Sequence, residues 1–245
     1  MRISFLTLCC ITLACFVAGC STRSISNSGY NPYGGEYAGE LDELSVLGSS
    51  DGGSITEVDI QAAVSNKADV TLARGSKIVL VQSGARFPDE AMMTQLQPLF
   101  SIVPLTGIPV GSSHRGYTPP DVTAVQQPLD KTYRLAAARA GAQTLMVYWG
   151  ILESGIVDQA TKTVSWVPIA GRIIPDEKQE MRIRIKAAVV DVATGKWVLV
   201  TPESFGDNRV SAHINRENAD QKQVETLKQQ AYGALAQELK SKFTL

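Results

Sequence analysis

Continuous apolar runs mark the strands expected at the centre of the fold. Residues 77–82 read Lys-Ile-Val-Leu-Val-Gln, and residues 145–152 are apolar at nearly every position. Uninterrupted runs of this kind, rich in β-branched and aromatic side chains, are typical of strands buried on both faces. Residues 102–105 are a shorter candidate. The run at 145–152 is therefore predicted to be the central strand.

A different pattern follows toward the C-terminus. Residues 181–186 alternate strictly between apolar and basic, which predicts a half-buried strand. Its outer face carries Arg182, Arg184 and Lys186, which are expected to be solvated, so that reversing the charge at Arg182 and Arg184 leaves the fold intact. Residues 187–192 continue this strand and are expected to be buried on both faces.

Two hairpins complete the predicted sheet. Residues 193–196 include a glycine, as tight turns prefer, and lead into a strand at 197–200. A polar turn at 158–163 leads into a returning arm at 164–169. Pro168 has no N–H to donate, which favours an edge or a bulge for this arm.

Three helices are expected from apolar positions at helical spacing. The first begins at Pro88, because proline is favoured in a first turn, and ends near Pro98. The second covers residues 129–140 and is capped by Gly141. The third covers residues 218–243 and has one apolar face, so it is predicted to pack across the sheet.

These elements predict an α/β (α+β) fold with a mixed sheet, an antiparallel C-terminal meander, helices packed on the sheet and a long C-terminal helix. Residues 67–245 are expected to form the globular domain, with a long loop at 106–127. Residues 20–66 are polar and rich in glycine, which predicts a flexible tether reaching roughly 35 to 40 Å. Two apolar patches interrupt the tether, at 41–47 and 55–64, and the second is expected to be a short helix docking on the domain.

Residues 1–19 have the parts of an export signal. Arg2 precedes a long apolar run, and the segment ends in small residues before Cys20. Val17-Ala18-Gly19-Cys20 resembles the lipobox of bacterial lipoproteins, which implies cleavage after Gly19 and a lipid on Cys20. Several acyl chains on one cysteine would give a stable membrane anchor. Ser21 resembles the sorting position of lipoproteins sent to the outer membrane, so the expected location is the periplasmic face of that membrane.

Composition excludes several classes of protein. The chain has 245 residues, with 23 Lys and Arg against 24 Asp and Glu. Removing the signal takes away only one charge, and the mature chain then has a small acidic excess, unlike a nucleic-acid binder. The cysteines are Cys9, Cys10, Cys15 and Cys20. The mature protein is therefore expected to have no disulfide, no free thiol and no cysteine metal site.

Two stretches resemble a known group of lipoproteins. They are Leu-Ala-Ala-Ala-Arg-Ala-Gly-Ala-Gln-Thr-Leu-Met-Val at 135–147 and Ala-Val-Val-Asp-Val-Ala-Thr-Gly-Lys at 188–196. The order of elements around them is similar to the rhombotarget lipoprotein family and, more distantly, to curli-secretion lipoproteins and lipoprotein activators of penicillin-binding proteins. The resemblance spans roughly residues 75–205. It implies an α/β sandwich in the periplasm with a protein-binding or accessory role, and it brings no catalytic residue.

Few residues suggest catalysis. His114 and His213 are the two histidines, and there is no His-Glu-x-x-His and no phosphate-binding glycine loop. A Gly-x-Ser-x-Gly occurs at 48–52, but it lies in the polar segment and not between a strand and a helix, so no nucleophile elbow is expected. No metal site and no cofactor are expected, and His114 is interpreted as a loop residue. The alternative is a periplasmic hydrolase of peptidase type whose active site has no recognisable motif.

The remaining candidate is a basic surface. Arg182, Arg184 and Lys186, extended by Arg172, would attract an acidic partner. The competing interpretation is an ordinary solvated face neutralised by nearby acids. The sequence thus predicts an accessory or partner-binding lipoprotein that acts on an envelope protein or on the cell wall.

Overall fold

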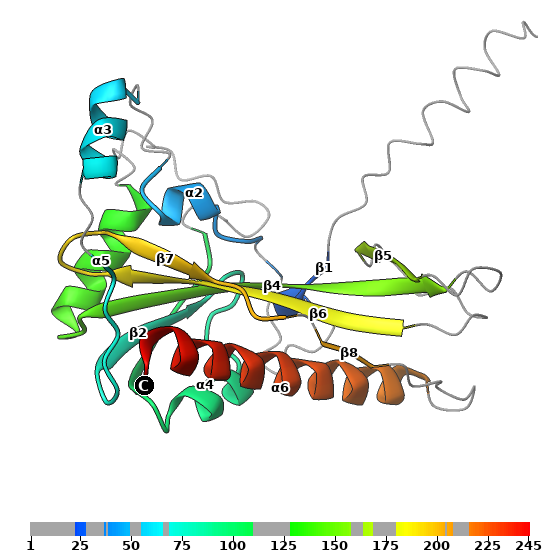
Figure 1. The fold of residues 1–245 in the computed structure, drawn as a ribbon. Coiled ribbons are helices and arrows are strands. Elements are labelled where there is room, and N and C mark those ends of the chain that lie inside the picture. The colour runs from blue at the N-terminus through cyan, green and yellow to red at the C-terminus, as the bar shows by residue number, and fades with distance from the viewer. Residues whose placement is uncertain are drawn as a thin grey trace, which may run out of the picture.

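The computed structural model describes residues 23–27, 37, 39–49, 55–65, 69–109, 128–157, 164–168, 180–203, 205–207 and 216–245. These residues build a mixed α/β fold around one sheet (Figure 1). The predicted fold class is confirmed.

Within the described residues the sheet has eight strands, in the order β3-β2-β4-β6-β7, with β1 and β5 also on β4 and β8 also on β6. Their bounds are β1 Arg23–Ser24, β2 Lys77–Gln82, β3 Ser101–Leu105, β4 Thr144–Val157, β5 Val164–Pro168, β6 Glu180–Asp191, β7 Trp197–Val200 and β8 Phe205–Asp207. The predicted central strand is thus β4, which extends five residues beyond its apolar run.

The sheet has a parallel and an antiparallel part. β2 lies between β3 and β4 and is parallel to both. β4, β6 and β7 are antiparallel in turn, as the predicted meander requires. β5 pairs with β4 alone among the described strands, and Pro168, which favours an edge or a bulge, is its last residue.

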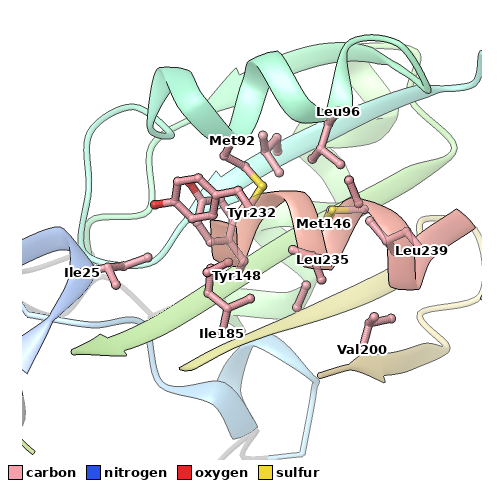
Figure 2. Packing of buried hydrophobic residues seen from close by; sticks show 14 of the residues in the cluster. Ile25, Met92, Leu96, Met146, Tyr148, Ile185, Val200, Tyr232, Leu235 and Leu239 are labelled. Carbon is pink, nitrogen blue, oxygen red and sulfur yellow. The ribbon is translucent and has the colours of Figure 1, made fainter. Parts of the chain in front are cut away.

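Helices cover both faces of the sheet. α4 (Glu90–Leu96) and α6 (Arg216–Phe243) pack on one face, where a large apolar cluster includes Met92, Met146 and Leu235 (Figures 1 and 2). α2 (Glu43–Val46) and α5 (Leu129–Arg139) pack on the other, around Tyr133 and Trp149. β4 supplies alternate residues to the two clusters, as a strand buried on both faces must.

The predicted tether is wrong for two segments. β1 pairs with β4, and the 3₁₀ helix η2 (Ile25–Asn27) follows it, with the Ile25 side chain only 1% exposed. Figure 2 shows Ile25 pointing into the same cluster as Tyr148. Leu41 and Val46 are buried in the opposite cluster. A polar composition hid these contacts because a few apolar side chains, spaced widely, are enough to dock a segment on an existing core.

The short helix predicted near residues 55–64 forms as α3 (Glu57–Ser65), but its predicted docking is wrong. All its residues are exposed, with Val58 at 76% and Val64 at 63%. The other expected elements lie close to their predicted bounds. Gly141 and Gly195 both adopt the positive φ that their cap and turn positions require. β8 was not predicted from the sequence.

Candidate functional site

The predicted basic row lies on one face of β6. Ile183 and Ile185 point into the cluster beneath α6, so Arg182, Arg184 and Lys186 point to the opposite face, which α2 and α5 partly cover. The alternation of the sequence is therefore confirmed. What surrounds the three cations was not visible in the sequence.

Glu153 on β4 binds two of these cations. It pairs in register with Arg182, whose Nε lies 2.5 Å from Glu153 Oε2. The Glu153 side chain is 7% exposed and that of Arg182 is 20% exposed, so this pair is largely withdrawn from water. Arg184 Nη1 is 3.6 Å from Glu153 Oε1, and the Arg184 side chain is 53% exposed. Arg182 thus has a structural role as the partner of Glu153, whereas the half-exposed Arg184 can contact a binding partner.

Lys186 is held by the N-terminal part of the chain. Its ammonium forms an ion pair with Glu43 of α2 and lies 5.9 Å from the centre of the Trp149 ring. The indole Nε1 of Trp149 donates in turn to the backbone oxygen of Leu41 at 2.9 Å. These contacts fasten residues 41–47 onto the sheet, and they explain why this segment is ordered despite its composition.

A second polar cluster lies where β2 ends, and sequence reasoning missed it. Gln82 Oε1 accepts from Tyr148 Oη at 2.5 Å and from the backbone N–H of Asp89 at 2.7 Å. The Asp89 carboxylate accepts from Lys228 Nζ at 2.8 Å and from Tyr232 Oη at 2.5 Å. The start of α4 is thereby joined to α6.

Electrostatics indicate a structural role for this cluster. Burial, with Asp89 nearby, raises the pKa of Tyr148 and of Tyr232 well above 10, so both stay protonated as hydrogen-bond donors. Lys228 is 3% exposed, and its charge is compensated by Asp89. The sequence did contain one signal for this cluster. Lys228 lies on the apolar face of the last helix, next to Leu227 and about two turns before Leu235, where a charged residue needs a partner.

The N-terminal segment completes this cluster. Ser26 Oγ accepts from Gln82 Nε2 at 3.0 Å and donates to the backbone oxygen of Ser83 at 2.6 Å. Ser83 Oγ accepts from the backbone N–H of Leu41 at 2.7 Å. Both N-terminal segments are therefore bound by hydrogen bonds at the end of β2 as well as by apolar contacts.

Comparison with known proteins gives the family. The model of the YafT bacterial lipoprotein family matches residues 42–242. The chain belongs to the YafT bacterial lipoprotein family. No curated protein matches the sequence. The YafT match begins at Asp42, the N-cap of α2, so the matched region includes part of the predicted tether.

Membership of the YafT family confirms that the protein is a bacterial lipoprotein. It does not support the predicted likeness to rhombotarget or curli-secretion lipoproteins. Within the part of the chain that the structure describes, no helix is long and apolar enough to cross a membrane. Among the same residues, no three metal-binding side chains come together.

Several predicted residues lie outside the described ranges. These are Gly19, Cys20 and Arg172, together with His114 and His213. Of the basic row, the structure brings Arg182, Arg184 and Lys186 onto one face, with their counter-charges on Glu153 and Glu43.

Proposed function

We propose that the protein is an accessory lipoprotein that binds an acidic partner with the charged face of β4 and β6. A lipid on Cys20, attached after cleavage following Gly19, anchors it to the periplasmic face of the outer membrane. The family match and the lipobox-like sequence support the anchor. Ser21 supports the outer-membrane address.

Arg184 carries the proposal for the binding face. On this face Arg182 is paired with Glu153 and Lys186 with Glu43, and Arg184 is left half exposed and 3.6 Å from Glu153. An exposed guanidinium beside a neutralised pair presents a surplus positive charge and several hydrogen-bond donors. Carboxylates of an envelope protein or of the cell wall suit such a surface, and Arg172 is proposed to extend it.

The test is partner affinity. A photo-crosslinker placed beside Arg184 identifies the envelope component, and its binding to the purified protein is then measured. Arg184→Glu is expected to weaken binding about tenfold or more, equivalent to about 1.4 kcal/mol, with a loss that shrinks at high salt. Arg74→Glu makes the same charge change at an exposed turn before β2 and serves as the control.

Two results would contradict the proposal. Equal affinity for the Arg184→Glu and Arg74→Glu proteins would remove the face as a binding surface. Turnover of a peptide panel by the purified protein, lost in His114→Ala, would instead support the periplasmic hydrolase. The anchor has its own test, because Cys20→Ala is expected to release the protein from washed membranes.

A further inference from the structure

The first described residues of the chain are already part of the core. Arg23 and Ser24 pair with Leu152 and Ile151 of β4, Ser24 is 4% exposed and Ile25 is 1% exposed. Burial of the apolar Ile25 side chain stabilises the docked segment. The hydrogen bonds of Ser26 to the end of β2 add to this. We call residues 23–27 the N-terminal clamp.

Covalent geometry limits the distance between Cys20 and the N-terminal clamp. Only Ser21 and Thr22 stand between Cys20 and the clamp. Three Cα–Cα steps of 3.8 Å bring Arg23 within about 11 Å of Cys20, however the chain runs. Cys20, the residue proposed to carry the lipid, is therefore close to β1 along the chain, and the reach of roughly 35 to 40 Å expected from a flexible tether is not available between them.

The same geometry places the binding face near the lipid. Ser24 pairs with Ile151, and Ile151 pairs with Arg184 on its other side. Neighbouring strands lie about 4.8 Å apart, so the backbones of Ser24 and Arg184 are separated by roughly 10 Å. Arg184 thus belongs to the part of the domain nearest the anchor.

We infer that the N-terminal clamp holds the domain at the membrane surface, so that its partner is a protein embedded in or bound to that same membrane. This inference rests on the proposed lipid at Cys20 and on the proposed binding face. The inference narrows the choice of acidic partner. A domain held at the membrane surface meets proteins of that membrane, whereas a domain on a long tether could also reach carboxylates of the cell wall.

Two insertions test the clamp. One variant carries a 20-residue Gly/Ser segment between Thr22 and Arg23, and its matched control carries the same segment between Pro32 and Tyr33, beyond the clamp. A cysteine introduced at Leu44, which is 57% exposed and lies outside the clamp, is the one free thiol of the lipidated protein, because all natural cysteines lie at or before position 20. It carries a donor dye, and vesicles of neutral and anionic phospholipid carry a headgroup acceptor.

The expected results differ between the insertions. The insertion before Arg23 allows a root-mean-square reach of roughly 25 Å, and energy transfer should fall about twofold or more for a pair whose Förster distance matches that reach. The control insertion should leave transfer unchanged. Equal losses for both insertions would show that the clamp does not hold, and no loss for either would show that another surface holds the domain.

Further measurements separate this inference from the proposed function. Flotation with the vesicles reports the lipid anchor, so a protein that does not float contradicts the proposed function rather than the clamp. Crosslinking through Arg184 to a membrane protein should be lost with the insertion before Arg23 and kept with the control. Binding of the unlipidated Cys20→Ala protein to anionic vesicles, abolished by Arg184→Glu, would identify phospholipid as the partner and overturn the protein partner.

Discussion

The side chain of Ile25 lies directly on Gly150 of β4. A Cβ added at Gly150 would lie 2.6 Å from Ile25 Cδ1 and 2.9 Å from its Cγ2, closer than such atoms approach. Because Gly150 has no side chain, the side chain of Ile25 in η2 can pack directly against the backbone of β4. A glycine within an otherwise bulky strand has this steric reason to be there.

Gly150→Ala is expected to destabilise the fold by about 1 to 3 kcal/mol, because Ile25 must move. Ile25→Ala alone should cost about 2 to 4 kcal/mol through the cavity it leaves. In the double variant the clash is gone, so the two losses should not add. Urea unfolding of the four proteins measures this coupling. Additive losses would show that the two residues are not in contact, and Ile55→Ala, at a side chain 67% exposed, is the control.

Arg182→Gln and Arg184→Gln should have unlike effects on stability. Removing Arg182 leaves the buried Glu153 carboxylate with a weak partner at 3.6 Å, and the expected loss is about 1 to 3 kcal/mol. Removing the half-exposed Arg184 should change stability by less than about 0.5 kcal/mol. The structure contradicts the premise of the sequence-based expectation for Arg182, whose side chain is only 20% exposed and is paired with Glu153. Thermal unfolding checks the contrast, and equal losses would contradict it.

The pair between Asp89 and Lys228 predicts a rescue. Asp89→Ala leaves a buried ammonium without its carboxylate and should cost about 2 to 4 kcal/mol. Adding Lys228→Met removes that charge, so the double variant should recover at least about 1 kcal/mol relative to Asp89→Ala. Denaturant midpoints of the single and double variants give the answer. A double variant less stable than Asp89→Ala would show that Lys228 has another role.

Alkaline pH should unfold the protein partly through Tyr133. Burial raises the pKa of Tyr133 from 10 to about 12. The neutral form is thus favoured in the folded state, and this stabilisation is complete below pH 10 and is lost as the pH rises toward 12. Tyr133→Phe should cost about 1 kcal/mol at neutral pH, because it removes the hydrogen bond to Thr106 O at 2.8 Å, but should flatten the decline between pH 10 and 12. Unfolding free energies measured from pH 8 to 12 test this, and parallel curves would contradict it.

Periodicity predicted the regular elements well. The buried run at 145–152, the alternation at 181–186 and the apolar face of the last helix correspond to β4, β6 and α6 because local pattern and tertiary burial agree there. The sequence did not show which neighbouring strands run parallel and which antiparallel, because both kinds of neighbour of a fully apolar strand have the same composition.

The site was predicted only in part. Alternation correctly grouped Arg182, Arg184 and Lys186, but their acids come from Glu153 at the end of a long strand and from Glu43 in the supposed tether. Such pairing depends on register between distant segments, which no local window contains. Ile25 was missed for the same reason, because its burial follows from Gly150 and not from its own neighbours.

The clamp also has a consequence for the order of events during synthesis. Trp149 and Leu41 bond across 108 positions of the chain, and β1 pairs with the same distant strand. The segment next to Cys20 is therefore among the first parts of the fold to be made and among the last to find its partner, because long-range pairing waits for both strands. β1 and η2 therefore cannot reach their native contacts until β4 has been made.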